Sequence, residues 1–386
     1  MDRINSGGLK MDLEKYSGRS KHELDTPCLT LDIDIIADNL ALMRDFVTAA
    51  GKKLRPHVKT HKCSEIAKQQ LAAGGCAGLC AAKVSEAAGL IAAGLTDILI
   101  TSPVVTIQKI AALMECAKSA RIMTVIDNRD NTDALNLAAG ESCLKLKVLV
   151  DVNPAMGRTG VAFEEALELG KYAASLPNLE LAGIQCYAGN LQHIGNFKQR
   201  QQSSLLMMQR AAEVFRQFRS SGLNCEIFTG TGTGTFNIDS EIPEMTDFQV
   251  GSYCVMDAEY LQTGGSANPE RFDLFKPALS LQASVISVNQ PDFVTVDAGL
   301  KALYYTPHAP PVVLNQPGSG WRYEWFGDEH GRVYFPVPSM KPRLGGRIEL
   351  SASHCDPTIN LFDSMWIIKD DIVIDCWKID LRGCCC

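Results

Sequence analysis

A short run of basic residues, RPHVKTHK at 55–62, is the first candidate for chemistry in a chain that is otherwise acidic. It ends a predicted strand and carries Lys59, with four cationic or imidazole side chains close by in the sequence: Arg55, His57, His61 and Lys62. A lysine held in a pocket among cationic neighbours has a lowered pKa, and the neutral amine can form a Schiff base. A solvated surface lysine, or a basic patch for nucleic acid, is the alternative.

The overall charge argues against nucleic acid. The 386 residues include 37 Lys and Arg against 44 Asp and Glu, a net charge of −7, whereas nucleic-acid binding depends on neutralising phosphates. The start lacks the apolar core of a secretory signal, and no run of 18 apolar residues predicts a membrane span. Fourteen scattered cysteines show no disulfide framework. We therefore expect a cytoplasmic small-molecule enzyme with reduced thiols and no membrane partner.

A glycine-rich stretch, TGTGTGT at 229–235, follows a predicted strand and is the clearest single feature. Gly232 and Gly234 let the backbone approach a ligand closely and present N–H groups to an anion, and Thr233 adds a hydroxyl donor. No Gly-Lys-Ser/Thr follows, so the stretch is not a nucleotide P-loop. It predicts a phosphate-binding loop, with a merely flexible loop as the alternative.

Lys59 and this loop together predict a particular cofactor. A Schiff-base lysine and a phosphate site in one domain fit pyridoxal 5'-phosphate. Arg158, which follows a predicted strand at 144–152, would then face the pyridine nitrogen. Tyr187 or Tyr253 would pack against the cofactor or form a hydrogen bond with it.

A second cluster, SASHCDPTINLFD at 351–363, contains metal-ligand residue types. On an extended segment residues i and i+2 point the same way, so His354 and Asp356 converge while Cys355 points away. An imidazole and a carboxylate suit Mn²⁺ or Mg²⁺. If the segment is turned instead, Cys355 becomes a possible ligand and Zn²⁺ is favoured. A purely structural turn is the remaining alternative.

The elements that must position these residues alternate regularly. Short apolar strands are separated by amphipathic helices, and eight strands are counted at 53–59, 77–82, 97–102, 121–127, 144–152, 181–189, 225–231 and 247–253. This pattern predicts a (β/α)8 TIM-type barrel, with a doubly wound open sheet as the alternative. In a barrel the candidate residues lie at the carboxyl ends of the strands, where active sites form.

The alternation of strands and helices ends after residue 270, where strands and proline-rich turns replace long helices. We predict three parts: an N-terminal segment at 1–27 that packs with the last domain, the barrel at 28–270, and a β-rich domain at 271–386 that carries the metal-ligand cluster. The expected β strands of the last domain lie at 278–288, 292–299, 347–353 and 365–377.

Several motifs in order resemble the D-threonine aldolase family, which includes 3-hydroxy-D-aspartate aldolases and, more distantly, D-serine dehydratases. They are DTPCLTLD, RPHVKTHK, KVSEA, GRTGV, TGTGTG, GSYCVMD, VDAGLK, DEHG and HCDPTINLFD. The resemblance covers about residues 25–380. It implies an alanine-racemase-like barrel that binds pyridoxal phosphate, a β-rich C-terminal domain and a homodimer.

The resemblance also implies roles for single residues. Lys59 matches the cofactor-bearing lysine, and His193 matches a histidine that acts on the substrate hydroxyl. The remaining matches are Arg158 at the ring nitrogen, Tyr187 and Tyr253 in the cofactor pocket, Gly232, Thr233 and Gly234 at the phosphate, and His354 and Asp356 at the metal.

The implied reaction is the retro-aldol cleavage of a D-threonine-like substrate to glycine and an aldehyde. The dehydratase branch carries His-x-Cys at the metal, so Asp356 favours the aldolases. Cleavage of 3-hydroxy-D-aspartate, dehydration of D-serine or a hydroxyaspartate, racemisation, and a non-catalytic cofactor carrier are the alternatives. The chain departs from many relatives at Ala82, Ala188, Thr231 and Phe362, which bears on cofactor affinity and substrate range.

Overall fold

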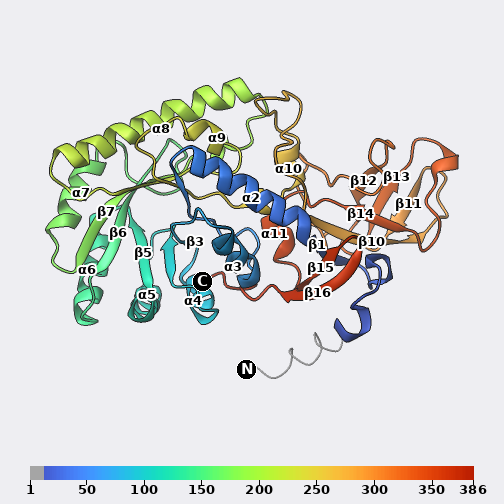
Figure 1. Ribbon diagram of the computed structural model, residues 1–386, viewed down its shortest axis with the longest axis horizontal. Helices are drawn as coiled ribbons and strands as arrows, with labels where there is room; N and C mark the ends of the chain where they lie inside the picture. The colour runs from blue at the N-terminus through green and yellow to red at the C-terminus, as the bar shows by residue number, and fades with distance from the viewer. Residues whose placement is uncertain (1–12) are drawn as a thin grey trace. The chain divides into compact units, whose positions relative to one another are not determined.

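The computed structural model describes residues 13–386, which form two compact units (Figure 1). The barrel unit comprises residues 41–251 together with 383–386. The β-rich unit comprises residues 13–40 together with 252–382. The division falls inside helix α2 (Ile33–Ala49). None of the described helices is both long and apolar enough to cross a membrane.

The barrel unit is built on eight parallel strands in the order β2-β9-β8-β7-β6-β5-β4-β3. Their bounds are β2 (Lys53–Leu54), β3 (Leu79–Ala81), β4 (Asp97–Ile100), β5 (Arg121–Ile126), β6 (Leu146–Val152), β7 (Leu179–Cys186), β8 (Ile227–Gly230) and β9 (Asp247–Phe248). Single parallel bridges, Leu54 to Cys76 and His57 to Cys80, join the two ends of this series. The predicted (β/α)8 barrel is confirmed, and the open sheet is excluded.

Helices follow the strands and cover them (Figure 1). They are α3 (Ser64–Ala73), α4 (Val84–Ala92), α5 (Ile107–Ser119), α6 (Arg129–Glu141), α7 (Ala166–Ser175), α8 (Phe197–Ser220) and the short α9 (Phe236–Asp239). Thr106, Asn128 and Asn196 begin three of them by accepting a backbone hydrogen bond at the N-cap. Because helices cover the sheet, the strands are buried almost continuously, and Leu99 and Leu149 lie in one core cluster.

The β-rich unit holds the second sheet, in the order β12-β13-β11-β10-β1-β15-β16 with β14 beside β10. The strands are β1 (Cys28–Asp32), β10 (Leu279–Ser287), β11 (Phe293–Val296), β12 (Arg322–Trp325), β13 (Gly331–Tyr334), β14 (Arg347–Leu350), β15 (Ser364–Lys369) and β16 (Ile372–Lys378). The short helices are η1 (Lys21–Glu23), η3 (Ser252–Cys254), α10 (Ala258–Leu261), η4 (Pro338–Met340) and α11 (Cys355–Ile359).

One sequence expectation needs correction in this sheet, and one hairpin was not predicted. The range 28–270 assigned β1 to the barrel, but β1 pairs antiparallel with β10 and parallel with β15, so its backbone hydrogen bonds belong to the β-rich unit. The hairpin of β12 and β13 was not expected, because its residues do not form a continuous apolar or alternating run. Residues 1–12 of the predicted N-terminal segment lie outside the described residues.

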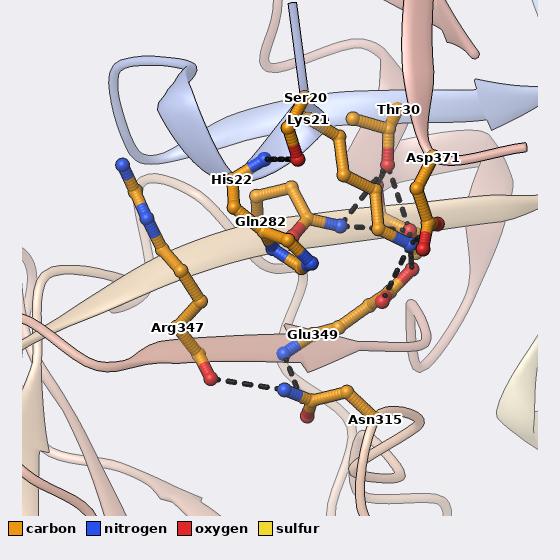
Figure 2. Close-up of polar contacts among 10 residues, drawn as sticks. Ser20, Lys21, His22, Thr30, Gln282, Asn315, Arg347, Glu349 and Asp371 are labelled. Atoms are coloured by element: carbon orange, nitrogen blue, oxygen red, sulfur yellow. Dashed lines mark hydrogen bonds and ion pairs between the residues drawn. The ribbon is translucent and has the colours of Figure 1, made fainter.

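The buried side chain of Lys21 joins the N-terminal segment to this sheet through ion pairs (Figure 2). Lys21 is 8% exposed, and its Nζ lies 3.0 Å from Glu349 Oε2 on β14 and 2.8 Å from Asp371 Oδ1 beside β16. Ser280 also donates to Glu349, over 2.7 Å. Burial removes the charged amine of Lys21 from water, and the ion pairs compensate for the lost solvation.

The Lys21→Ala substitution should destabilise the β-rich unit by about 3 kcal/mol, because it leaves the carboxylate of Glu349 buried without its cation. Urea unfolding of the whole protein measures the change. Lys369→Ala is the matched control, since it removes an exposed ion pair, 2.9 Å from Asp34, in the same unit. Equal effects of the two substitutions would contradict a special role for Lys21.

Candidate active site

The loop that carries Lys59 lies at the carboxyl end of the barrel strands. The N–H of His57 donates to Val250 O and that of Val58 donates to Cys80 O, each over 2.9 Å. The loop is therefore held between the ends of β9 and β3. A Cβ on Gly251 would lie 2.3 Å from the Thr60 hydroxyl, so the two segments approach closely. Lys59 itself is half-buried in this loop.

The positive charges expected around this lysine are paired or absent. Arg55 Nη1 lies 3.1 Å from Asp97 Oδ1, and Lys62 forms an ion pair with Glu86. His61 accepts a backbone hydrogen bond at Nδ1, over 3.2 Å, and is therefore a neutral ring. Arg55 and Lys62 are thus held in ion pairs that fix the loop, and the Schiff-base role of Lys59 stays a prediction.

The glycine-rich loop has the close packing expected of a phosphate site. An ideal Cβ on Gly232 would lie 2.6 Å from Gln192 Oε1, and one on Gly234 would lie 2.1 Å from Gln192 O. A side chain at Gly234 would collide with backbone, and one at Gly232 would displace the amide of Gln192, so glycine lets the backbone of this loop reach the rim of the barrel. Thr231 adopts φ +62° and Thr233 is buried. These residues fit a group bound through backbone donors and hydroxyls.

A buried polar network below this loop was not found from the sequence. Arg200 is fully buried, and its guanidinium donates to Gly234 O over 2.9 Å and to Ile194 O. Gln192 accepts from Gly234 N over 3.0 Å. Arg200 therefore ties the phosphate loop to the segment after His193. One signal was available: Arg200 stands four residues before Ser204 and eight before Met208, on the buried face of α8.

Asp239 anchors the same loop from the other side. Its two oxygens accept from Ser204 Oγ over 2.6 Å and from Thr235 Oγ1 over 2.7 Å. Burial raises the pKa of Asp239, and hydrogen bonds from hydroxyls, Thr231 included, act against that rise. The Thr231 hydroxyl lies 2.9 Å from Thr235 Oγ1. These bonds offset the cost of a β-branched residue in the left-handed region.

Arg158 and Tyr187 lie next to the phosphate loop. The Arg158 guanidinium lies 5.3 Å from the centre of the Tyr187 ring, and that ring lies 3.3 Å from an ideal Cβ on Gly232. Tyr187 directly follows β7, and the exposed His193 follows the short helix η2 (Gly189–Leu191). The structure therefore brings Arg158, Tyr187 and Gly232 together at one rim of the barrel.

Tyr253 belongs to the β-rich unit rather than to the barrel unit. It is 1% exposed in η3, and its ring packs edge-to-face on Phe275 with centroids 5.7 Å apart. Its expected role in the cofactor pocket stays a prediction.

The metal-ligand cluster is turned, which is one of the alternatives that the sequence left open. His354 has extended backbone and is the N-cap of α11, whereas Asp356 lies in the first turn of that helix. Cys355 is fully buried, its Sγ lies 3.0 Å from Met256 O, and burial raises its pKa well above 9.0. It is therefore a thiol facing the interior. The alternative in which Cys355 ligates zinc is thereby disfavoured.

His354 lies among carboxylates. Its Nδ1 is 2.9 Å from Asp257 Oδ2 and 3.6 Å from Glu259 Oε2. Burial lowers the pKa of His354, but the hydrogen bond to Asp257 and the charges of Asp356 and Glu259 outweigh burial and raise it to about 9. Among residues 13–386, no group of three or more His, Cys, Asp or Glu side chains is arranged to hold a metal ion. A cation here would rely on the pair His354 and Asp356 and on non-protein ligands.

Asp151, inside the barrel, carries a buried carboxylate close to the loop of Arg158. Gln185 Nε2 donates to its Oδ1 over 2.9 Å and Thr159 Oγ1 to its Oδ2 over 2.7 Å. Burial is the largest influence and raises the pKa of Asp151 to about 6, against the opposing effect of these two hydrogen bonds. The carboxylate thus fixes one end of the Arg158 loop through Thr159.

Asp151→Asn should change how stability depends on pH. The folded-state pKa is raised above the ordinary 3.8. The contribution of Asp151 to the free energy of unfolding is therefore fully present below pH 3.8. It is lost as pH rises through about 6, which lowers the free energy of unfolding by up to roughly 3 kcal/mol. The amide removes this loss, and the Thr159 hydroxyl can turn to accept from it. Denaturant unfolding of both proteins from pH 4 to 7 measures the difference, and a pH-independent difference would refute the assignment.

Comparison with known protein families identifies the class to which this fold belongs. The model of the alanine racemase N-terminal domain matches residues 31–258, and that of the putative serine dehydratase domain matches residues 278–368. The class defined by the barrel is therefore the alanine-racemase-like proteins.

The most similar relatives match nearly the whole chain. D-threonine aldolase from an Arthrobacter species is 37% identical over 377 residues, which cover 97% of each chain. 3-Hydroxy-D-aspartate aldolase from Paracoccus denitrificans is 33% identical, with 96% of each chain covered. The crystal structure of D-threonine aldolase from Filomicrobium marinum matches with a TM-score of 0.88 and 34% identity, over 96% of this chain and 98% of that one. The chain belongs to the family of these aldolases, and this membership supports pyridoxal phosphate as the cofactor.

Proposed function

We propose that the protein is a lyase that uses pyridoxal phosphate and a divalent metal to cleave a D-β-hydroxy-α-amino acid into glycine and an aldehyde. The observation that carries the proposal is the likeness to D-threonine aldolase, which extends over both the barrel unit and the β-rich unit. A substrate like D-threonine is therefore our first choice.

The barrel residues supply the cofactor site in this proposal. The amine of Lys59 would hold the cofactor covalently, and the loop with Gly232, Thr233 and Gly234 would bind its phosphate. Arg158 would face the ring nitrogen, because its guanidinium stays protonated and donates. Tyr187 would pack against the ring. The cofactor, when bound, accepts the electrons of the broken Cα–Cβ bond.

The hydroxyl of the substrate must lose its proton for this bond to break. We assign that proton transfer to His193, whose exposed imidazole follows β7 on the same rim as Tyr187. His354 and Asp356 would hold the metal, which supplies Lewis acidity for the substrate hydroxyl. Nitrogen and carboxylate ligands without a thiol favour Mn²⁺ or Mg²⁺, and Zn²⁺ is less favoured because Cys355 is buried as a thiol.

A second substrate has a specific observation in its favour. The relative from Paracoccus denitrificans is a 3-hydroxy-D-aspartate aldolase of nearly equal similarity, and this substrate would give glycine and glyoxylate. The compartment and the oligomeric state stay proposals as well. The fourteen cysteines are free thiols, which supports a reducing cytoplasm, and a homodimer is expected from the family resemblance alone.

Incubation with D-threonine, pyridoxal phosphate and Mn²⁺ should release acetaldehyde without ammonia. The release should stop with EDTA and return with excess Mn²⁺, because the metal assists at the hydroxyl. Acetaldehyde and ammonia are measured in the same samples, with D-3-hydroxyaspartate as the parallel substrate. Ammonia and an oxoacid without an aldehyde would show a dehydratase instead, and full activity in EDTA would remove the metal from the proposal.

The Lys59→Ala substitution should abolish both the visible absorbance of bound cofactor and the cleavage activity, because no other amine is assigned to hold the cofactor. The two quantities are measured on protein purified with added pyridoxal phosphate. Lys118→Ala is the matched control, since Lys118 forms an exposed pair with Glu115 on α5. Normal turnover by the Lys59 variant would end the proposal.

A further inference from the structure

Asp257 is a buried carboxylate with three hydrogen-bond donors around it. It is fully buried, and its Oδ1 accepts from the N–H of Tyr260 over 3.1 Å, which makes it the N-cap of α10. Its Oδ2 lies 2.9 Å from His354 Nδ1, within hydrogen-bond distance, and accepts from the N–H of Cys355 over 3.1 Å. Both oxygens are thus occupied, and these three partners lie in the β-rich unit.

The surrounding backbone holds Asp257 and His354 against each other. The N–H of Ala258 donates to Ala352 O over 2.9 Å, and the N–H of Glu259 donates to Ser353 O over 3.1 Å. These two hydrogen bonds therefore hold the segment at 256–260 alongside the segment at 352–355. The side chain of His354 is 25% exposed, whereas that of Asp257 is inaccessible. One edge of the imidazole is fixed in the interior while the rest of the ring remains accessible.

The chemistry of the pair decides which nitrogen carries the proton. An ionised carboxylate only accepts hydrogen bonds, so the nitrogen that faces Asp257 must be protonated Nδ1–H. When the ring gives up its second proton, the lone pair is left at Nε2. Histidine ligands in metal sites commonly donate their other ring N–H to a carboxylate in this way.

We infer that Asp257 is a positioning residue that fixes His354 as the Nδ1–H tautomer and so presents Nε2 as the ligand of the divalent cation. This inference rests on the metal role in the proposed function. It assigns a task to a residue of the GSYCVMD motif that has no direct part in holding the metal.

Asparagine at this position separates a tautomer effect from a packing effect. Its single oxygen can face the N–H of Tyr260, and its amide then points N–H donors toward His354. The imidazole can accept such a bond only at a bare Nδ1, which moves the proton to Nε2 and blocks the ligand position. If the oxygen faces the N–H of Cys355 instead, it still accepts from Nδ1–H, but a neutral amide oxygen is a weaker acceptor than a carboxylate. We expect Asp257→Asn to weaken Mn²⁺ binding by about 10- to 100-fold.

Glu259 offers a matched control for charge. Its Oε2 lies 3.6 Å from the same Nδ1, beyond hydrogen-bond distance, and its carboxylate is only half-buried. Glu259→Gln removes a negative charge two residues from Asp257 without removing the hydrogen bond that sets the tautomer. We expect its Mn²⁺ affinity to stay within about threefold of wild type, because the carboxylate is partly solvated and makes no hydrogen bond to the imidazole.

The test is Mn²⁺ titration of the cofactor-loaded protein, followed by the electron paramagnetic resonance signal of free Mn²⁺, for wild type, Asp257→Asn, Glu259→Gln and Asp356→Ala. A selective loss in Asp257→Asn, with thermal unfolding close to wild type, supports the inference. Unchanged affinity, or an equal loss in both carboxylate variants, overturns it. Wild type that binds no Mn²⁺ overturns the metal role as well, which separates the two failures.

Nuclear magnetic resonance of the wild type covers the case in which Asp257→Asn does not fold. Protein with ¹⁵N-labelled histidine and bound Zn²⁺ should show a protonated Nδ1 and a metal-bound Nε2 for His354, assigned by comparison with Asp356→Ala. Metal at Nδ1, or a proton at Nε2, would overturn the inference.

Discussion

The parallel register of eight strands is the constraint on which the rest of the barrel depends. Because neighbouring strands run the same way, the residues that follow β2, β6, β7 and β8 emerge at one rim although they lie far apart in the sequence. Lys59, Arg158, Tyr187 and the phosphate loop owe their common location to this register alone. A reversal of any one of these strands would send its loop to the opposite rim.

Rim loops need support of their own, and buried polar side chains provide it here. Arg200 and Asp239 lie under the phosphate loop, and each would be costly to bury without partners. Their hydrogen bonds to Gly234, Ser204 and Thr235 supply those partners. Such a network holds the loop in one arrangement, because every alternative leaves a buried charge unsatisfied.

The periodicity of apolar residues explains which elements could be predicted from the sequence. Runs such as 121–127 and 144–152 are apolar enough to be strands only if both faces are covered, so a parallel sheet covered by helices follows from them. The count of eight such strands favours the barrel over the open sheet. The turned backbone after His354 and the hairpin of β12 and β13 depend on contacts with segments distant in sequence. The roles of Gln192 and Asp257 were not predicted for the same reason. The role of a single polar residue depends on the partners that the fold brings to it.

Each of the two candidate sites is held by contacts within its own unit. The bonds described for Asp257 join 256–260 to 352–355 within the β-rich unit, and those of Arg200 join loops of the barrel unit. Each set of side chains is therefore oriented by local contacts. The bonds described for one site share no residue with those described for the other. We therefore expect substitutions near His354 to leave the geometry of the phosphate loop unchanged.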